Sequence, residues 1–297
     1  MKLLVTGREG QLARGLAETA GAGVQVVAIG RPELDLADEK SVAAALAREH
    51  PDIVVNAAAY TAVDKAETEP ALAHAVNALG AEHAAKACVA RAIPIIHIST
   101  DYVFDGTKSG PYLEGDSTAP INVYGRTKLE GEQRVAKACD RHLILRTAWV
   151  HSPWGVNFVK TMLRLAATRP NIGVVDDQMG SPTYAPHLAA IVLAIAARIA
   201  ADPAGVRWGV YHAVGGGETT WFGFAREIFR YAAERELPAA EVAAITTAAY
   251  PTAARRPANS RLNCDKLRLS LGLELPDWRI GAQDCVARIS SALGEQG

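Results

Sequence analysis

The sequence lacks the features that mark disulfide-rich, nucleic-acid-binding and membrane-spanning proteins. Its four cysteines are far apart and form no Cys-x-x-Cys pair, which argues against a disulfide framework or a zinc site. The net charge is −1 and the basic residues are dispersed, so the basic surface of a DNA- or RNA-binding protein is missing. The most apolar long stretch, residues 187–201, contains Arg198 and is shorter than the roughly 20 residues that cross a membrane. It predicts a core helix.

The composition suits a globular protein with its own hydrophobic core. Of 297 residues, 49% are hydrophobic and 21% are charged, which is ordinary for a soluble enzyme. The first seven residues are too short for a secretory signal and are followed at once by Arg8 and Glu9, so they indicate a buried strand. We expect a cytoplasmic protein with reduced, buried cysteines that binds neither nucleic acid nor membrane.

The first 150 residues alternate short β-rich runs with helical patterns, which predicts an α/β fold with a parallel sheet covered on both faces. The predicted strands are residues 2–6, 24–29, 53–56, 93–99 and 143–147. The predicted helices between them are residues 11–20, 40–49, 70–91 and 123–139.

After residue 150 the alternation gives way to longer connections rich in glycine and proline, with predicted helices at residues 158–168, 186–201 and 222–236. We therefore divide the chain into a first domain, residues 1–150, and a smaller, mixed α/β substrate-binding region, residues 151–297. The chain can cross back to the sheet within the second part.

A glycine-rich turn follows the first predicted strand and opens the first helix. Its spacing is Gly-x-x-Gly-x-x-Ala, in which Gly7 permits the tight turn and Gly10 lets the backbone approach a phosphate. Gln11 and Leu12 begin the helix whose amino end would face the pyrophosphate of a dinucleotide. The turn predicts a Rossmann-like, doubly wound sheet that binds NAD(P), although a tight turn that binds nothing has the same pattern.

The second strand ends at Arg31 and not at the carboxylate that would bind an NAD ribose. Arg31 suits a 2′-phosphate, which favours NADPH, with NADH as the alternative; a solvated loop charge is an equal reading. Asp35 and Leu36 are candidates for contacts with the adenine. After the third strand, the small side chains of residues 57–59 would let a dinucleotide pass closely; these candidate cofactor contacts are Ala57, Ala58, Ala59 and Tyr60.

A possible proton-transfer site is formed by Thr100, Tyr124 and Lys128. Tyr124 and Lys128 are four residues apart and so share one helix face, and Thr100 lies at the carboxyl end of a strand, where open α/β sheets bind ligands. An ammonium beside a phenol lowers the phenol pKa from about 10 toward neutrality. The three residues could therefore move a proton onto a carbonyl oxygen, whereas the alternative is an exposed helical pair with no task.

Taken together, the turn, the strand end at Thr100 and the Tyr124/Lys128 pair resemble the extended short-chain dehydrogenase/reductase family. The resemblance implies that Thr100, Tyr124 and Lys128 are catalytic and that Tyr124 and Lys128 also contact the cofactor. Further segments are similar to members that act on dTDP-linked sugars: residues 56–67, 99–106, 175–183, 209–213 and 256–262. The implied activity is NADPH-dependent reduction of the C4 ketone of a dTDP-linked 4-keto-6-deoxy sugar.

Within this family, sugar dehydratases carry Asp-Glu after the catalytic Thr, and that Glu is needed to eliminate water. Here Asp101 and Tyr102 stand in these positions, which indicates reduction without dehydration. The resemblance implies that Thr100, Asp101 and Tyr102 contact the sugar. It implies the same of Trp149, for which a core tryptophan is the alternative.

Arg255, Arg256 and Arg261 form the best concentration of guanidinium groups in the second half and could bind the diphosphate. Arg256 and Arg261 lie in the family-like segment, and the alternative is a solvated basic loop. His97 lies in an apolar strand and is expected to be a core histidine. With no His, Asp or Glu cluster at metal spacing, we predict no metal site.

The sequence leaves three questions open. The protein could reduce or epimerise another nucleotide-linked 4-keto-6-deoxy sugar, or serve as a non-catalytic regulatory subunit of methionine adenosyltransferase, as some relatives do. We expect a monomer or a homodimer. Some family members form dimers bridged by a metal that an acidic residue of the first helix helps to hold, and the matching position here is Gly15, which argues against such a bridge.

Overall fold

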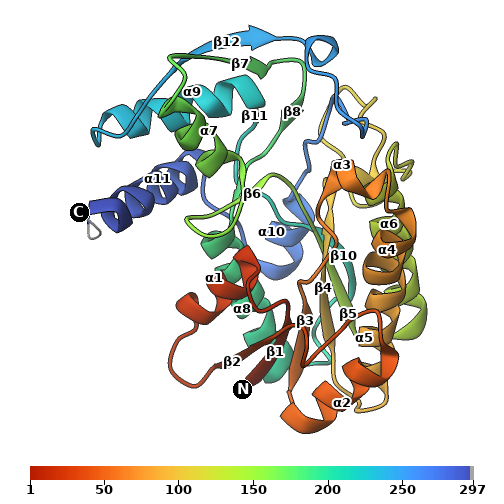
Figure 1. The fold of residues 1–297 in the computed structure, drawn as a ribbon. Coiled ribbons are helices and arrows are strands. Elements are labelled where there is room, and N and C mark those ends of the chain that lie inside the picture. Colours follow the sequence, from red (N-terminus) through yellow and green to blue (C-terminus); the bar gives the residue numbers. More distant parts are fainter. Residues whose placement is uncertain (295–297) are drawn as a thin grey trace.

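The computed structural model describes residues 1–294 and is built on one parallel sheet. Its six strands lie in the order β10-β5-β4-β3-β1-β2, with every neighbouring pair parallel (Figure 1). Their bounds are β1 Lys2–Thr6, β2 Gln25–Ile29, β3 Ile53–Asn56, β4 Ile95–Thr100, β5 His142–Thr147 and β10 Gly209–His212. The central strands are buried almost throughout, which is why they appear in the sequence as short, nearly continuous apolar runs.

Helices cover both faces of the sheet, as a doubly wound fold requires. Side chains of β1 alternate between two cores: Leu3 and Val5 pack with one set of helices, and Leu4 packs with the other. The first set is α1 Gln11–Thr19, α8 Ala185–Ala201 and α10 Asp265–Leu271. The second set is α2 Glu39–Glu49, α5 Gly80–Val89 and α6 Val123–Ala138. The predicted fold class is confirmed.

A second layer of structure lies beyond the carboxyl ends of the strands, at the top of Figure 1. Its core is formed by three helices: α7 Phe158–Ala166, α9 Trp221–Ala233 and α11 Trp278–Gly294. Short strands pair around them: β7 Asn171–Val175 with β12 Glu241–Ile245, β6 Val150–His151 with β9 Thr183–Tyr184, and β8 Met179–Gly180 with β11 Thr219–Thr220. This layer closes over the edge of the sheet where ligands bind in open α/β folds.

The second half of the chain also contributes to the sheet layer. β10 pairs with β5 in register from Gly209 opposite Leu143 to His212 opposite Arg146, and α8 packs against α1. The apolar stretch at residues 187–201 lies inside α8 and is confirmed as a core helix. No helix among residues 1–294 is long and apolar enough to span a membrane. The division at residue 150 stays a prediction.

The helix expected at residues 70–91 is present as one continuous helical run over residues 70–89, with a π-helical turn inside it that the sequence did not predict. The structure has α4 Pro70–His74, a π-helical turn at Ala75–Leu79 and then α5. Asn77 lies in the π turn, and its buried side chain forms hydrogen bonds with the backbone of Tyr60 and the hydroxyl of Thr127. These partners are distant in sequence, so helix propensity does not reveal the π turn.

Candidate functional site

The glycine turn after β1 has the shape that a phosphate site needs. Gly7 has a φ of +93°, which L side chains rarely adopt, and a Cβ there would lie 3.2 Å from the Cβ of Ala58. Gly10 precedes α1, and no side chain caps the amides of this helix. Gln11 and Leu12 occupy its first turn, so their backbone is placed for an anionic group. The turn therefore fits a dinucleotide pyrophosphate.

The side chains predicted to contact the adenosine lie in the segment after β2. Arg31 is exposed, Asp35 accepts a hydrogen bond from the Ala37 amide at 2.9 Å, and Leu36 is buried. Arg8, which was not among the predicted residues, lies near this segment: its backbone lies against Gly30, and its guanidinium pairs with Glu33 at 2.8 Å. Its position inside the glycine turn was the signal that could have identified it.

Polar side chains of neighbouring elements hold the loop after β3 in place. Thr6 donates to Asn56 at 2.7 Å and accepts from the amide of Ala58 at 3.0 Å. The amide of Tyr60 donates to Asn77 at 2.8 Å. These bonds hold the half-buried stretch that runs through Ala57, Ala58 and Ala59 beside Gly7, where a cofactor would pass close to small side chains.

The structure brings Thr100, Tyr124 and Lys128 together. Thr100 is the last residue of β4, and α6 begins after Asn122, whose side chain accepts from the amide of Gly125 at 2.7 Å and so caps the helix. Lys128 is buried and donates to the carbonyl oxygen of Ile98 at 2.6 Å. The pair on α6 therefore faces the carboxyl end of β4, as the helical spacing predicts.

The electrostatics of this trio differ from the sequence-based expectation. Burial raises the pKa of the Tyr124 phenol, and a hydrogen bond with Thr100 only partly opposes the rise. Burial lowers the pKa of Lys128 to about 8, against the opposing pull of the Glu132 carboxylate. The expected lowering of the Tyr124 pKa by Lys128 is therefore wrong for this structure. Tyr124 is therefore protonated at neutral pH, as a proton donor must be, although the raised pKa makes it a weaker acid than a free phenol.

Asp101 and Tyr102 form a short 3-10 turn, Asp101–Val103, directly after Thr100. Burial raises the pKa of Asp101 to about 6, while hydrogen bonds from Ser260 and Thr100 oppose the rise. The ring of Tyr102 meets that of Tyr124 edge to face, with centroids 5.8 Å apart. Both predicted sugar contacts thus lie beside the predicted proton donor.

Trp149 stacks on Trp221, with ring centroids 3.5 Å apart and an angle of 11° between the planes. Its φ is +49°, and a Cβ at Gly180 would lie 2.5 Å from its indole. Trp149 is half-buried rather than a closed core residue. The positive φ of a bulky residue is a strained conformation that the surroundings must impose, and such strain gathers at functional sites.

The predicted diphosphate arginines occupy different surroundings. Arg256 is held by Asp64 of α3, Val63–Ala66, with Nη2 to Oδ2 at 2.7 Å, and its charge acts on Tyr102. Arg261 donates to Asn259 at 2.8 Å and pairs with Glu218 at 3.2 Å. Arg256 therefore lies at the site with one carboxylate partner, whereas Arg261 is engaged both by its own loop, through Asn259, and by Glu218.

His97 is confirmed as a core histidine. Its Nδ1 accepts from the side-chain amide of Asn56 at 3.0 Å, and burial lowers its pKa well below the ordinary value. Residues 1–294 contain no group of three or more His, Cys, Asp or Glu side chains placed to hold a metal ion. The cysteines are free, and Cys264 alone among the four is only half-buried.

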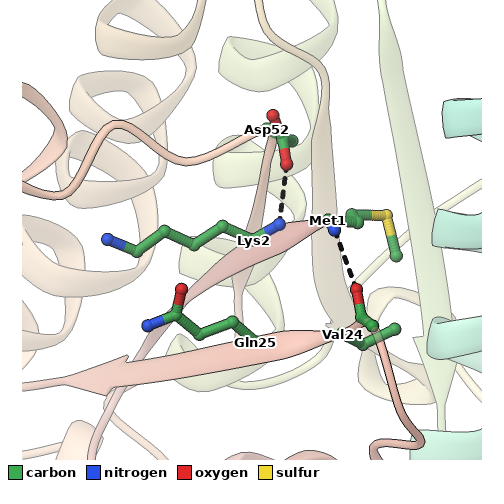
Figure 2. A pocket seen from close by; sticks show the side chains of 6 residues that line it. Met1, Lys2, Val24, Gln25 and Asp52 are labelled. Atoms are coloured by element: carbon green, nitrogen blue, oxygen red, sulfur yellow. Dashed lines mark hydrogen bonds between the residues drawn. The ribbon is translucent and has the colours of Figure 1, made fainter.

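An open hollow at the other end of the sheet lies beside the amino ends of β1 and β2 (Figure 2). Its residues are engaged with each other: the amide of Lys2 donates to Asp52 at 2.6 Å, and the terminal ammonium of Met1 donates to the carbonyl of Gly23 at 2.8 Å. Parallel sheets of this kind bind ligands at the opposite, carboxyl end, where the predicted residues gather.

The comparisons with known proteins agree on one family. The family model described as RmlD substrate binding domain matches residues 1–291. The dTDP-4-dehydrorhamnose reductase of Sinorhizobium fredii is 49% identical over 278 residues, covering 94% of each chain. That of Escherichia coli K12 is 48% identical over 251 residues, covering 84% of this chain and 83% of its own.

Solved structures give the same result. The dTDP-4-dehydrorhamnose reductase of Bacillus anthracis in complex with NADP has a TM-score of 0.90 at 35% identity, with 97% of this chain and 99% of that chain covered. UDP-glucose 4-epimerase of Brucella ovis in complex with NAD has a TM-score of 0.80 at 19% identity, covering 97% of this chain and 98% of that chain. The second likeness shows a shared fold alone.

Proposed function

The chain belongs to the dTDP-4-dehydrorhamnose reductase family, and we therefore propose that it is the NADPH-dependent oxidoreductase that converts dTDP-4-dehydro-β-L-rhamnose to dTDP-L-rhamnose. This reaction reduces the C4 ketone of the sugar and is the last step of dTDP-rhamnose biosynthesis. The observation that carries the proposal is the convergence of Thr100, Tyr124 and Lys128 at the carboxyl end of β4, in a chain that matches family members along almost its whole length.

NADPH supplies the hydride for this reduction when it is bound. Its pyrophosphate would lie at the Gly7 to Leu12 turn, where a glycine permits the tight backbone and the amides of α1 have no side-chain cap. Arg31, together with Arg8, whose backbone lies against Gly30, would hold the 2′-phosphate. The remaining contacts would come from residues after β2 and β3: Asp35, Leu36, Ala57, Ala58, Ala59 and Tyr60.

Tyr124 would donate the proton that the C4 oxygen gains as the ketone becomes an alcohol. Its raised pKa means that the proton is present at neutral pH, and Thr100 is placed to bind the same oxygen and orient it. Lys128 carries its ammonium at the end of β4, where it would bind the nicotinamide ribose and stabilise the negative charge left on Tyr124. In this proposal Tyr124 is the proton donor, Thr100 orients the substrate oxygen and Lys128 supplies the stabilising cation.

Sugar and diphosphate contacts would surround this centre. Asp101 and Tyr102 adjoin Thr100, and the half-buried Trp149 lies at the start of the second layer. Arg256 would bind the diphosphate from a position beside Tyr102. Arg261, although engaged by Asn259 and Glu218, would add a second guanidinium to the same end of the substrate.

We further propose a cytoplasmic monomer or homodimer. Gly15 faces α8, since a Cβ there would lie 3.2 Å from the carbonyl oxygen of Ala185 and 3.3 Å from the Cβ of Ala189. This position is buried in the core, so it offers no place for an acidic ligand to a metal shared between subunits.

The substitution Tyr124→Phe tests the function. It removes the phenolic proton and keeps the ring that packs on Tyr102, so turnover should fall by about 10²-fold or more while NADPH binding is retained. NADPH oxidation should be measured with dTDP-, GDP- and UDP-linked 4-keto sugars.

The comparison between sugars is the control for substrate identity. A wild-type protein that oxidises NADPH only with a GDP- or UDP-linked sugar would show a different nucleotide-sugar reductase. One that binds NADPH and turns over none of them would indicate a regulatory subunit. Full turnover by Tyr124→Phe would refute the assignment of the proton donor.

A further inference from the structure

A buried ion pair lies next to the proposed catalytic residues. Burial lowers the pKa of Lys128 and the Glu132 carboxylate of the pair opposes that shift, but the mechanism above gives the pair no step of its own. Arg146 of β5 donates to Glu132 of α6 through two nitrogens, Nε to Oε1 at 3.0 Å and Nη2 to Oε2 at 2.7 Å. The hydroxyl of Ser99 on β4 donates to the same Oε1 atom. The exposed fractions of Glu132, Arg146 and Ser99 are 3%, 4% and 3%, so all three are sealed from water.

The arrangement is not one that stability alone favours. Taking two charges out of water is costly, and well-packed apolar residues of similar size often serve a core as well or better. The Arg146 guanidinium lies 5.1 Å from the ring centroid of Phe104, and for its buried Nη1 atom the described residues provide no hydrogen-bond partner. A network left partly unsatisfied calls for another role.

The position of the pair indicates that role. Glu132 is four residues beyond Lys128 and eight beyond Tyr124, so the three share one face of α6. Ser99 immediately precedes Thr100, and it lies opposite Arg146 in the register of β4 and β5. The carboxylate therefore joins the helix that carries Tyr124 and Lys128 to the strand that carries Thr100.

We propose that Glu132, held by Arg146 and Ser99, is a positioning residue that fixes the depth and rotation of α6 against β4 and β5 and so aligns Tyr124 and Lys128 with Thr100. The inference rests on the proposed function, because it assumes that these three residues act together. Apolar packing between a helix and a sheet resists separation but allows sliding. The hydrogen bonds that Arg146 and Ser99 donate to the buried Glu132 carboxylate are directional, so they restrict the sliding of α6 over the sheet.

The test compares Glu132→Gln with a double variant, Glu132→Leu/Arg146→Met. Glu132→Gln keeps the shape of the side chain and leaves Arg146 charged and unpaired, so kcat should fall at least about tenfold and the protein should melt at a lower temperature. The KM values for NADPH and the dTDP sugar should stay within about threefold of wild type, because most of their proposed contacts come from elements other than α6. The double variant removes both buried charges, so its melting temperature should recover while kcat stays low.

Glu130→Gln is the matched control, because Glu130 lies on the same helix in a half-buried ion pair with Arg134 at 2.7 Å. Its kcat should equal that of wild type. Wild-type kcat in Glu132→Gln, or recovery of kcat together with melting temperature in the double variant, would overturn the proposal. So would failure of both variants to fold, because the pair would then be needed for stability. A wild-type protein without turnover would instead overturn the proposed function.

Discussion

Adding a single methyl group at Gly125 should impair catalysis while the protein still folds. Gly125 follows Tyr124 in the first turn of α6, where the helix approaches the 3-10 turn after β4. A Cβ at Gly125 would lie 2.1 Å from the carbonyl oxygen of Tyr102 and 3.0 Å from the Cβ of Pro120. We predict that Gly125→Ala lowers kcat by about 10²-fold while the protein stays folded.

The magnitude follows from the geometry. A separation of 2.1 Å falls about 1 Å short of the 3.0 Å below which real Cβ contacts essentially never occur. The obstacle is backbone, so either α6 or the turn at Tyr102 must move by that amount, and a misplacement of about 1 Å at reacting groups can cost about 10²-fold in rate. Stability changes less, because overpacking costs about 1–3 kcal/mol while alanine is favoured over glycine in a helix by about 1 kcal/mol.

The assay is steady-state NADPH oxidation with the dTDP-linked 4-keto sugar, together with thermal unfolding of each variant. Gly294→Ala is the control, because Gly294 also lies in a helix, α11, and a Cβ there would meet nothing within 4 Å. It should retain wild-type kcat. A folded Gly125→Ala protein with kcat within about threefold of wild type would refute the argument that α6 is held at fixed depth beside Tyr102.

The strands of the sheet could be predicted because buried parallel strands leave a local signal. Each of the five predicted strands is present within one or two residues, although β4 includes Thr100 itself. The sixth strand, β10, was not predicted. It has four residues, follows a long connection and owes its place to pairing with β5, a contact between residues more than sixty positions apart. No periodicity within the strand itself reports such a partner.

The residue types of the site could be predicted, but not the environments that set their properties. The spacing of Tyr124 and Lys128 predicts their shared helix face, whereas the direction of the Tyr124 pKa shift depends on burial, which the spacing does not report. The pairing of Arg256 with Asp64 joins positions 192 residues apart, and nothing near either residue in sequence indicates it. Helical spacing can therefore suggest a reaction without giving the charge states of its groups.

Two further predictions concern charge at the site. Burial lowers the pKa of Lys128 to about 8, so kcat/KM should fall above about pH 8 as the ammonium is lost. Between about pH 8 and pH 10.5 this lysine binds a proton in the unfolded chain but not in the folded protein. Its contribution to the free energy of unfolding should therefore rise with pH over this range. A kcat/KM profile that stays flat to about pH 10 would contradict this. The second change is Asp64→Asn, which removes the carboxylate that partly neutralises Arg256. If Arg256 binds the diphosphate, titration calorimetry with dTDP should show tighter binding, with the gain largest at low salt because the new attraction is between partly exposed charges. Weaker binding at every salt concentration would mean that Asp64 holds Arg256 in its binding position, and that orientation outweighs the charge.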